Sequence, residues 1–401
     1  MSSPSESVSE KSVAPTDITA KEEGVGDSDL EPEVPEGGLR AWSVVLGVWL
    51  VQFCTFGYTN AFGVYNDFYV REYLAQTATS SQISWIGSVQ LMITLSAGLF
   101  TGRCFDIGYF WHMMLGGSIL FVFCLFMLSL TQPEHYYQVF LAQGLGMGLA
   151  IGTTYIPGLG IISHWFRKRR AIALGVATTG SAVGGTLHPI MLNALFHGPV
   201  GFHNGVRASA GLNLGLLIIA LLLMKSRLPW QSSKGRRTFG EMKAYFKDVP
   251  YVVTILGTVM TLTGLYFPIF FLQLNAVKNG INQNLAFYTL AILNAGSTVG
   301  RVIPNFFVRR YGVFNVMVPC VAACAILIFC TLAVKTAVST VVFAILYGFF
   351  SGGYVGLLAP MVGSLARSDT EIGERLGMCF TFTGESFYYC SCSKRSLTTH
   401  F

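Results

Sequence analysis

The chain has 401 residues, of which 52% are hydrophobic and only 11% are charged. An average soluble domain carries roughly a quarter charged residues, so this composition excludes a soluble globule of this size. Several apolar runs approach the roughly 20 residues that a helix needs to cross the hydrocarbon core of a bilayer. The composition therefore predicts an all-α polytopic membrane protein.

The first 36 residues differ in charge from the remainder of the chain. They contain ten of the 20 acidic residues but only two of the 26 basic ones. The segment is rich in Ser, Pro and Glu and has no aromatic residue, which is typical of disordered chains. It has no basic start followed by an apolar run, so we do not expect a signal peptide. We interpret residues 1–36 as a disordered, acidic cytoplasmic tail.

Ten apolar segments are expected to be complete membrane helices. They occupy residues 43–66, 83–103, 112–131, 137–161, 171–196, 208–224, 250–274, 284–304, 313–334 and 338–364. The polar and basic segment 225–249 after the sixth helix is predicted to be a central cytoplasmic loop. It separates an N-terminal six-helix bundle, residues 37–224, from a C-terminal bundle, residues 250–384.

Basic residues are distributed unevenly between the predicted loops. If the N-terminus is cytoplasmic, the cytoplasmic loops contain 17 Lys and Arg, whereas the opposite loops contain four. Cytoplasmic loops of membrane proteins carry the excess of Lys and Arg. The bias therefore predicts a cytoplasmic N-terminus.

The two bundles contain an internal repeat. Segments 171–180 and 375–384 share a Thr-Gly pair at a distance of 204 residues. Three glycines of the fourth helix recur in the tenth helix at the same distance: Gly144, Gly148 and Gly152 correspond to Gly348, Gly352 and Gly356. Two parallel copies of six helices are the organisation of the major facilitator transporters. We therefore predict the major facilitator fold.

The end of the chain departs from this repeat. Gly384 corresponds to Gly180, but Glu385 replaces a small residue and the following residues are polar. A charged residue is costly inside a membrane helix. We therefore expect about ten full helices, an eleventh helix that begins and is not continued, and a polar tail at residues 385–401. The cytoplasmic gate of such a transporter, which closes partly against helix eleven, would then lack part of its partner surface.

Several segments resemble the monocarboxylate-porter family in its fungal form. They are "PEGGLRAWSVVLGVWLVQFCTFGYTNAFGVYNDFY" (35–69), "GRCFDIGYF", "SHWFRKRRAIALGVATTGSAVGGTLHPIM" (163–191), "AILNAGSTVGRVIPN" and "GERLGMCFTFTG". The resemblance implies secondary-active transport of a small organic solute, such as a monocarboxylate-like acid, by alternating access. Fungal relatives also include exporters of secondary metabolites and vitamin-type carriers, and these are the alternative.

Arg301, near the end of the eighth span, is the first candidate for contact with the solute. By resemblance to animal monocarboxylate porters, an arginine here pairs with the substrate carboxylate, which suits a guanidinium fork. Those porters have an acid one turn earlier and a lysine in helix one, where this chain has Ser297 and Phe62. Alternatively, Arg301 is a loop anchor that matches Arg103 in the first bundle.

His188 is the most informative titratable residue well inside a span. Ionisable groups in the membrane interior tend to be functional, and imidazole titrates near neutral pH, as a proton relay requires. None of the ten spans has an acid well inside it, so any proton coupling falls on His188 or on the solute. The alternative is a neutral histidine that joins two helices by a hydrogen bond.

Four further polar side chains are expected at a central cavity, because helices one, seven and eight line the cavity in the fold that the resemblance implies. They are Tyr58 and Asn60 in helix one, Gln273 in helix seven and Asn294 in helix eight. Each can exchange hydrogen bonds with an organic solute. Gln273 is the weakest candidate because it lies at the end of its span.

Asp106 is the one acid in the loop between the second and third spans, and we expect it and the nearby Arg103 to take part in gating. In facilitator families this acid braces the closed cytoplasmic gate, partly against helix eleven; here Ile107 replaces the basic residue that is often found next to it. The three glycines of the fourth helix lie one turn apart, where small residues let backbones approach closely. We expect packing there, on a surface that also slides during gating.

We expect no enzyme, cofactor or metal site. The sequence has no nucleotide-binding glycine loop and no HExxH motif, and its cysteines form neither a disulfide framework nor zinc pairs. The expected partners are the lipid bilayer and a small organic solute, with proton coupling open and nucleic acid not expected. We expect the plasma membrane, with an endomembrane as the alternative. A non-transporting sensor or truncated relic is the alternative to a transporter.

Overall fold

The structure is a computed structural model that describes residues 36–226, 243–366 and 371–384. The predictions for the acidic tail, for most of the central loop and for the tail 385–401 fall outside these residues. Throughout the described residues, every regular element is a helix, which confirms the all-α prediction.

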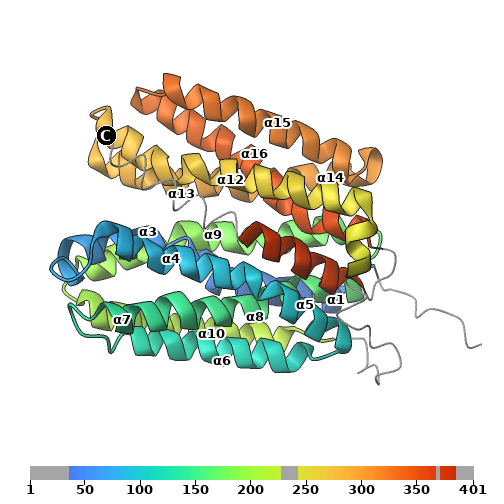
Figure 1. Cartoon of the computed structure of the whole chain (residues 1–401), viewed down its shortest axis with the longest axis horizontal. Helices are drawn as coiled ribbons and strands as arrows, with labels where there is room; N and C mark the ends of the chain where they lie inside the picture. Colours follow the sequence, from blue (N-terminus) through green and yellow to red (C-terminus); the bar gives the residue numbers. More distant parts are fainter. Residues whose placement is uncertain (1–35, 227–242, 367–370, 385–401) are drawn as a thin grey trace, which may run out of the picture. The chain divides into compact units, whose positions relative to one another are not determined.

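Two sets of helices follow one another along the chain (Figure 1). The first helix set consists of α1 (Leu39–Cys54), α2 (Phe56–Thr59), α3 (Phe62–Phe68), η1 (Tyr69–Tyr73), α4 (Ser80–Ser96), α5 (Gly98–Ile107), α6 (Phe110–Leu128), α7 (Tyr136–Val139), η2 (Phe140–Gly146), α8 (Met147–Gly160), η3 (Ile161–His164), α9 (Arg170–Phe196) and α10 (Gly201–Leu223). The second helix set consists of η4 (Lys243–Lys247), α12 (Val249–Lys278), α13 (Gln283–Gly300), α14 (Ile303–Tyr311), α15 (Val313–Cys330), η5 (Thr331–Ala333), α16 (Ala337–Ser364) and a final helix at residues 372–384.

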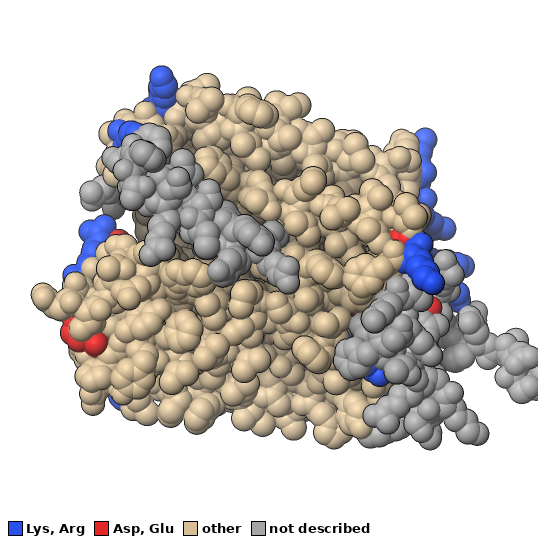
Figure 2. All heavy atoms as spheres, viewed as in Figure 1, with Lys and Arg blue, Asp and Glu red and all other residues tan. Residues whose placement is uncertain are grey.

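Eight helical stretches among the described residues are long and apolar enough to cross a membrane. On the face seen in Figure 2, the Lys, Arg, Asp and Glu side chains lie toward the two ends of the helices, and the band between them carries none. α9 and α13 coincide with predicted spans but are not among the eight. α9 is rich in Gly, Ser and Thr, because most of its surface packs against other helices. The predicted count of ten therefore stays a prediction.

The first span is not one continuous helix. α1 ends at Cys54, α2 ends at Thr59, and a further break at Asn60 and Ala61 precedes α3. α2 lies directly on α9, because a Cβ on Gly57 would come within 2.8 Å of the Cα of Gly184. Small residues on both helices therefore allow the broken segment to pack backbone against backbone.

The repeated glycines occupy equivalent places in the two sets. A Cβ on Gly152 would lie 2.8 Å from the carbonyl oxygen of Thr94 in α4, and one on its counterpart Gly356 would lie 2.9 Å from that of Arg301. α8 therefore packs on α4, and α16 packs on the end of α13. These contacts join helices of the same set, which agrees with the packing role expected for the glycines. Their expected role as a surface that slides during gating stays a prediction.

Gly348→Ala is expected to destabilise the protein, since its Cβ would overlap the backbone carbonyl oxygen of Leu293. Overpacking of this kind typically costs about 1–3 kcal/mol. Gly257→Ala is the matched control, because nothing lies within 4 Å of that position. Thermal unfolding of the two purified variants checks this. Equal melting temperatures would contradict the backbone contact.

The start of α9 is tied to the start of α1 by one carboxylate. Glu36 accepts hydrogen bonds from the backbone N–H groups of Arg167 at 3.1 Å, Arg169 at 3.2 Å and Lys168. Consecutive backbone N–H groups of this kind form an anion-binding nest. This contact with the basic loop therefore fixes where α9 begins.

Candidate functional site

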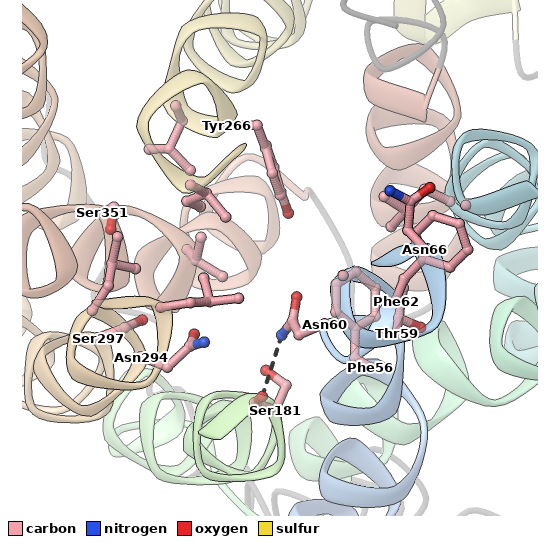
Figure 3. Close-up of a pocket in the computed structure, with 18 of the residues that line it drawn as sticks. Phe56, Thr59, Asn60, Phe62, Asn66, Ser181, Tyr266, Asn294, Ser297 and Ser351 are labelled. Atoms are coloured by element: carbon pink, nitrogen blue, oxygen red, sulfur yellow. Dashed lines mark hydrogen bonds between the residues drawn. The ribbon is translucent and has the colours of Figure 1, made fainter. Parts of the chain in front are cut away.

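A cavity of about 560 Å³ lies between the two helix sets (Figure 3). Broken segments of the first span and parts of α4, α8 and α9 line it on one side, and parts of α12, α13 and α16 line it on the other. Its polar lining includes Gln52, Thr59, Asn60, Asn66, Asp67, Thr178, Ser181, Gln273, Asn294, Ser297, Arg301 and Ser351. Its apolar lining includes Phe56, Phe62, Val70, Leu91, Leu265, Ile269, Leu290 and Leu293.

Arg301 is the buried cation of this lining, with 8% of its surface exposed. Its guanidinium donates to the backbone oxygen of Thr178 and the hydroxyl of Ser181 through Nη1, and to Ser297 Oγ at 3.3 Å through Nε. No carboxylate of the described residues pairs with it. A buried charge without a counter-ion is unfavourable, so the remaining donors of Arg301 are available to an acidic or strongly accepting solute group.

Asn60 and Asn294 reach the same helix from opposite sides of the cavity. Asn60 Nδ2 donates to the Ser181 oxygen at 3.4 Å, and Asn294 Nδ2 donates to the Gly185 oxygen at 3.2 Å. Gly185 separates them, because a Cβ there would lie 2.8 Å from Asn60 Nδ2 and 3.3 Å from Asn294 Nδ2. The sequence prediction that these two amides meet at a cavity therefore agrees with their placement, and their role toward a solute stays a prediction.

Gly185→Val is expected to displace both amides and to weaken solute binding roughly tenfold, because each hydrogen bond contributes about 0.5–1.5 kcal/mol. The measurement is the concentration dependence of transport in vesicles. Gly211→Val is the control, since nothing lies within 4 Å of Gly211. If both variants transport equally well, the two amides do not contact the solute.

The wall of the cavity opposite Arg301 includes aromatic side chains from the first span. Phe62 stands where the resemblance places a lysine, and its ring lies directly on Gly87 of α4, where a Cβ would overlap it. Phe56 packs against Tyr155 of α8 with ring centroids 4.9 Å apart and the rings tilted by 31°. The cavity thus combines a broad apolar surface with a cluster of amides and hydroxyls around one cation.

Tyr58 was expected at the cavity and His188 inside a span as a proton relay, and the structure buries both side chains. Neither lines the cavity. His188 is 1% exposed, and its Nε2 lies 3.2 Å from the oxygen of Phe53 in α1. The hydroxyl of Tyr58 shares a hydrogen bond of 2.5 Å with that of Tyr65 and accepts another of 3.2 Å from the hydroxyl of Ser209. Both side chains join helices inside the first set, as the alternative for His188 anticipated.

The cavity is open at one end. Asp67 and Gln273 belong to its lining and are exposed, and Asp67 pairs with Arg71 at 2.7 Å. We call this the Asp67 end. A smaller cavity of about 250 Å³ adjoins it and shares Asn60 and Gln273 with the main cavity. Gln273, the weakest sequence candidate, therefore lies at the mouth.

The opposite end, which we call the Asp106 end, is closed. Asp106 accepts hydrogen bonds from the backbone N–H groups of Gly373 at 3.3 Å and Glu374 at 2.8 Å. Asp106 therefore has partners at these residues, and the expected loss of further partner surface stays a prediction. Arg103 lies in the same last turns of α5. The gating roles of Asp106 and Arg103 stay predictions.

Sequence reasoning missed two features of the closed end. Arg375 counted as a loop cation but is 2% exposed, and Glu374 and Glu371, 6% and 5% exposed, are buried beside it. The motif "GERLG" gave a partial indication of buried charges, because charged residues at the start of an apolar run require partners once they are buried. Those partners come from a distant segment and have no local mark in the sequence.

A family model places the chain among known proteins. The model of the Major Facilitator Superfamily matches residues 48–383. The solved structure of the proton:xylose symporter XylE, bound to 6-bromo-6-deoxy-D-glucose, superposes with a TM-score of 0.70. That match covers 90% of this chain and 89% of XylE at 12% sequence identity, so it shows a shared fold.

Relatives among characterised proteins are fungal transporters. The chain is 37% identical to the aspyridones efflux protein apdF of Emericella nidulans, over 90% of this chain and 73% of that protein. It is 34% identical to the fujikurins efflux protein of Gibberella fujikuroi, over 86% of this chain and 73% of that protein. The fold, the cavity between two helix sets and these matches agree. The chain is an integral multi-pass membrane transporter that belongs to the Major Facilitator Superfamily.

Proposed function

We propose that the chain exports a fungal secondary metabolite by alternating access. The observation that carries this proposal is the central cavity of about 560 Å³, which combines an apolar wall with amides, hydroxyls and one buried cation, Arg301. Cavities of roughly 300–1,000 Å³ are typical for drug-sized organic ligands. An exported metabolite of that size, with an acidic or strongly accepting oxygen at Arg301, suits both the volume and the lining.

The names of the relatives support the same direction of transport. The aspyridones and fujikurins proteins are both described as efflux proteins. Their similarity extends over 90% and 86% of this chain. Export of a related class of organic molecule is therefore favoured over uptake of a nutrient.

A small monocarboxylate is the second candidate, and Arg301 is the observation that favours it. An unpaired guanidinium suits a carboxylate. However, Phe62 and Ser297 stand where the resemblance places the lysine and the acid of the proton-coupled site. A short-chain acid would also occupy only a small part of the cavity. We therefore rank this candidate below a secondary metabolite.

We place the N-terminus in the cytoplasm and the protein in the plasma membrane. The excess of basic residues in the predicted cytoplasmic loops, 17 against four, supports this orientation. The Asp67 end then faces outward, and the structure corresponds to an outward-open state with its cytoplasmic end closed. An exporter releases its solute from this state.

The test is transport by the full chain reconstituted in proteoliposomes. Aspyridones, fujikurins, lactate and riboflavin are loaded separately, and the release of each is followed with and without a proton gradient. We expect release of at least one metabolite and none of lactate. Release of lactate alone would favour the monocarboxylate candidate. Binding without any transport would favour the sensor alternative.

A further inference from the structure

The start of the final helix contains the most deeply buried charged side chain among the described residues. Arg375 is 2% exposed. Its guanidinium lies 4.8 Å from the ring centre of Tyr245 and 5.0 Å from that of Tyr251. A guanidinium that stacks on aromatic rings is attracted by their electron-rich faces. The two tyrosines come from η4 and α12, more than 120 residues earlier in the chain.

Two carboxylates complete the surroundings of Arg375. Its Nη1 lies 2.9 Å from Asp248 Oδ2, and its Nε lies 3.3 Å from Glu371 Oε2. The backbone oxygen of Arg375 also accepts a hydrogen bond of 2.6 Å from the hydroxyl of Tyr251. One side chain therefore fastens the start of the final helix to the beginning of α12, and every one of these partners belongs to the second helix set.

The same helix start meets the first helix set through its backbone. Asp106 accepts from the N–H groups of Gly373 and Glu374, which no hydrogen bond within a helix can satisfy at this position. The carboxylate of Glu374 points away from Asp106 and accepts a hydrogen bond of 2.8 Å from the hydroxyl of Tyr245. The two N–H groups reach Asp106 only while the helix start keeps this orientation.

We propose that Arg375 is a positioning residue of the closed Asp106 end. It holds the start of helix 372–384 against η4 and α12, so that two free backbone N–H groups face Asp106 of the other helix set. Without Arg375, four carboxylates gather at this end and repel one another: Asp106, Asp248, Glu371 and Glu374. The proposal rests on the alternating access proposed above and adds the residue that prepares the closing contact.

The geometry calls for arginine rather than lysine. Arginine presents a planar fork that contacts two acids at once and stacks between two rings. Lysine carries the same charge as a single compact ammonium group, so it can pair with one carboxylate but cannot reproduce both contacts. Arg375→Lys should therefore keep part of the positioning of the helix start, whereas Arg375→Gln should keep none.

Hydrogen exchange of the purified full chain in lipid nanodiscs, without any solute, tests the proposal. We expect Arg375→Gln to accelerate exchange at Gly373 and Glu374 more than tenfold. Exchange should also rise in α9 near Thr178, which belongs to the cavity lining, and should stay unchanged or fall near Asp67. Arg309→Gln is the matched control, because Arg309 is an exposed arginine in the last turn of α14.

A double-variant comparison separates positioning from general stability. If Arg375 acts through Asp106, then Arg375→Gln should add little to the exchange already produced by Asp106→Ala. Additive effects, or faster exchange at both ends of the molecule, would show a purely structural role and overturn the proposal. Unchanged exchange at Gly373 and Glu374 would overturn it as well. Should Arg375→Gln fail to fold, Arg375→Lys and Asp248→Asn are read in the same way.

This test is independent of the solute. Failure of every metabolite to be exported would overturn the proposed function and leave the exchange pattern as it is. Unchanged exchange in a chain that exports aspyridones would overturn the role of Arg375 and leave the proposed function intact.

Discussion

Replacing Arg301 with Gln is expected to reduce the affinity for an acidic metabolite roughly 100-fold. A hydrogen bond to a charged group contributes about 1.5–3 kcal/mol, and 1.4 kcal/mol corresponds to a tenfold change in affinity. Arg301 is the buried cation in the cavity lining and has no carboxylate partner among the described residues. The measurement is the concentration dependence of transport for the acid and for its neutral methyl ester.

The ester serves as the internal control for Arg301→Gln. Its transport should change little, because it carries no charge to pair with the guanidinium. Arg301→Lys should fall between the wild type and Arg301→Gln, since lysine keeps the charge and loses the fork. An equal loss for acid and ester would mean that Arg301 acts by bridging α13 to α9 through Thr178 and Ser181, and not by binding the solute.

Replacing Asp106 with Ala is expected to open the Asp106 end. The variant removes two backbone hydrogen bonds and a negative charge at a helix N-terminus, which stabilise the closed state by about 2 kcal/mol. The ratio of closed to open molecules should therefore fall roughly 30-fold. Spin labels at His112 and Tyr311, which lie in different helix sets near this end, report the ratio by pulsed electron resonance.

Asp106→Asn provides a graded comparison. The amide oxygen can still accept one backbone N–H, so this variant should lie between Ala and the wild type. Identical distance distributions for all three proteins would show that Asp106 does not stabilise the closed end. The closure would then depend on the glycine contacts between α5 and the final helix.

The length of the apolar runs was sufficient to predict the helices, and the repeat of glycines 204 residues apart predicted that the two sets share one plan. The prediction for helix one failed in detail. Tyr58 was expected at the cavity because helix one lines the cavity in the fold that the resemblance implies. The helix is broken at Thr55 and again at Asn60 and Ala61, so neighbouring residues turn toward different surroundings.

Arg375 illustrates a second limit of prediction from the sequence. A cation beside acids at the start of an apolar segment has the same local pattern whether it lies in a loop or is buried. Its burial depends on Tyr245 and Asp248, which lie 130 and 127 positions earlier. Only the packing of α12 beside the final helix brings them together, and no periodicity within either segment records that approach.

The glycines at the Asp106 end bear on how tightly the membrane is sealed. A Cβ on Gly98 would lie 3.2 Å from the oxygen of Gly377, and one on Gly373 would lie 2.6 Å from that of Gly102. The two backbones therefore touch along this line, which leaves no room for water between these two helices. We expect such a contact to limit the leakage of protons between transport cycles. A cell could then hold many copies of it in an energised membrane without dissipating the gradient.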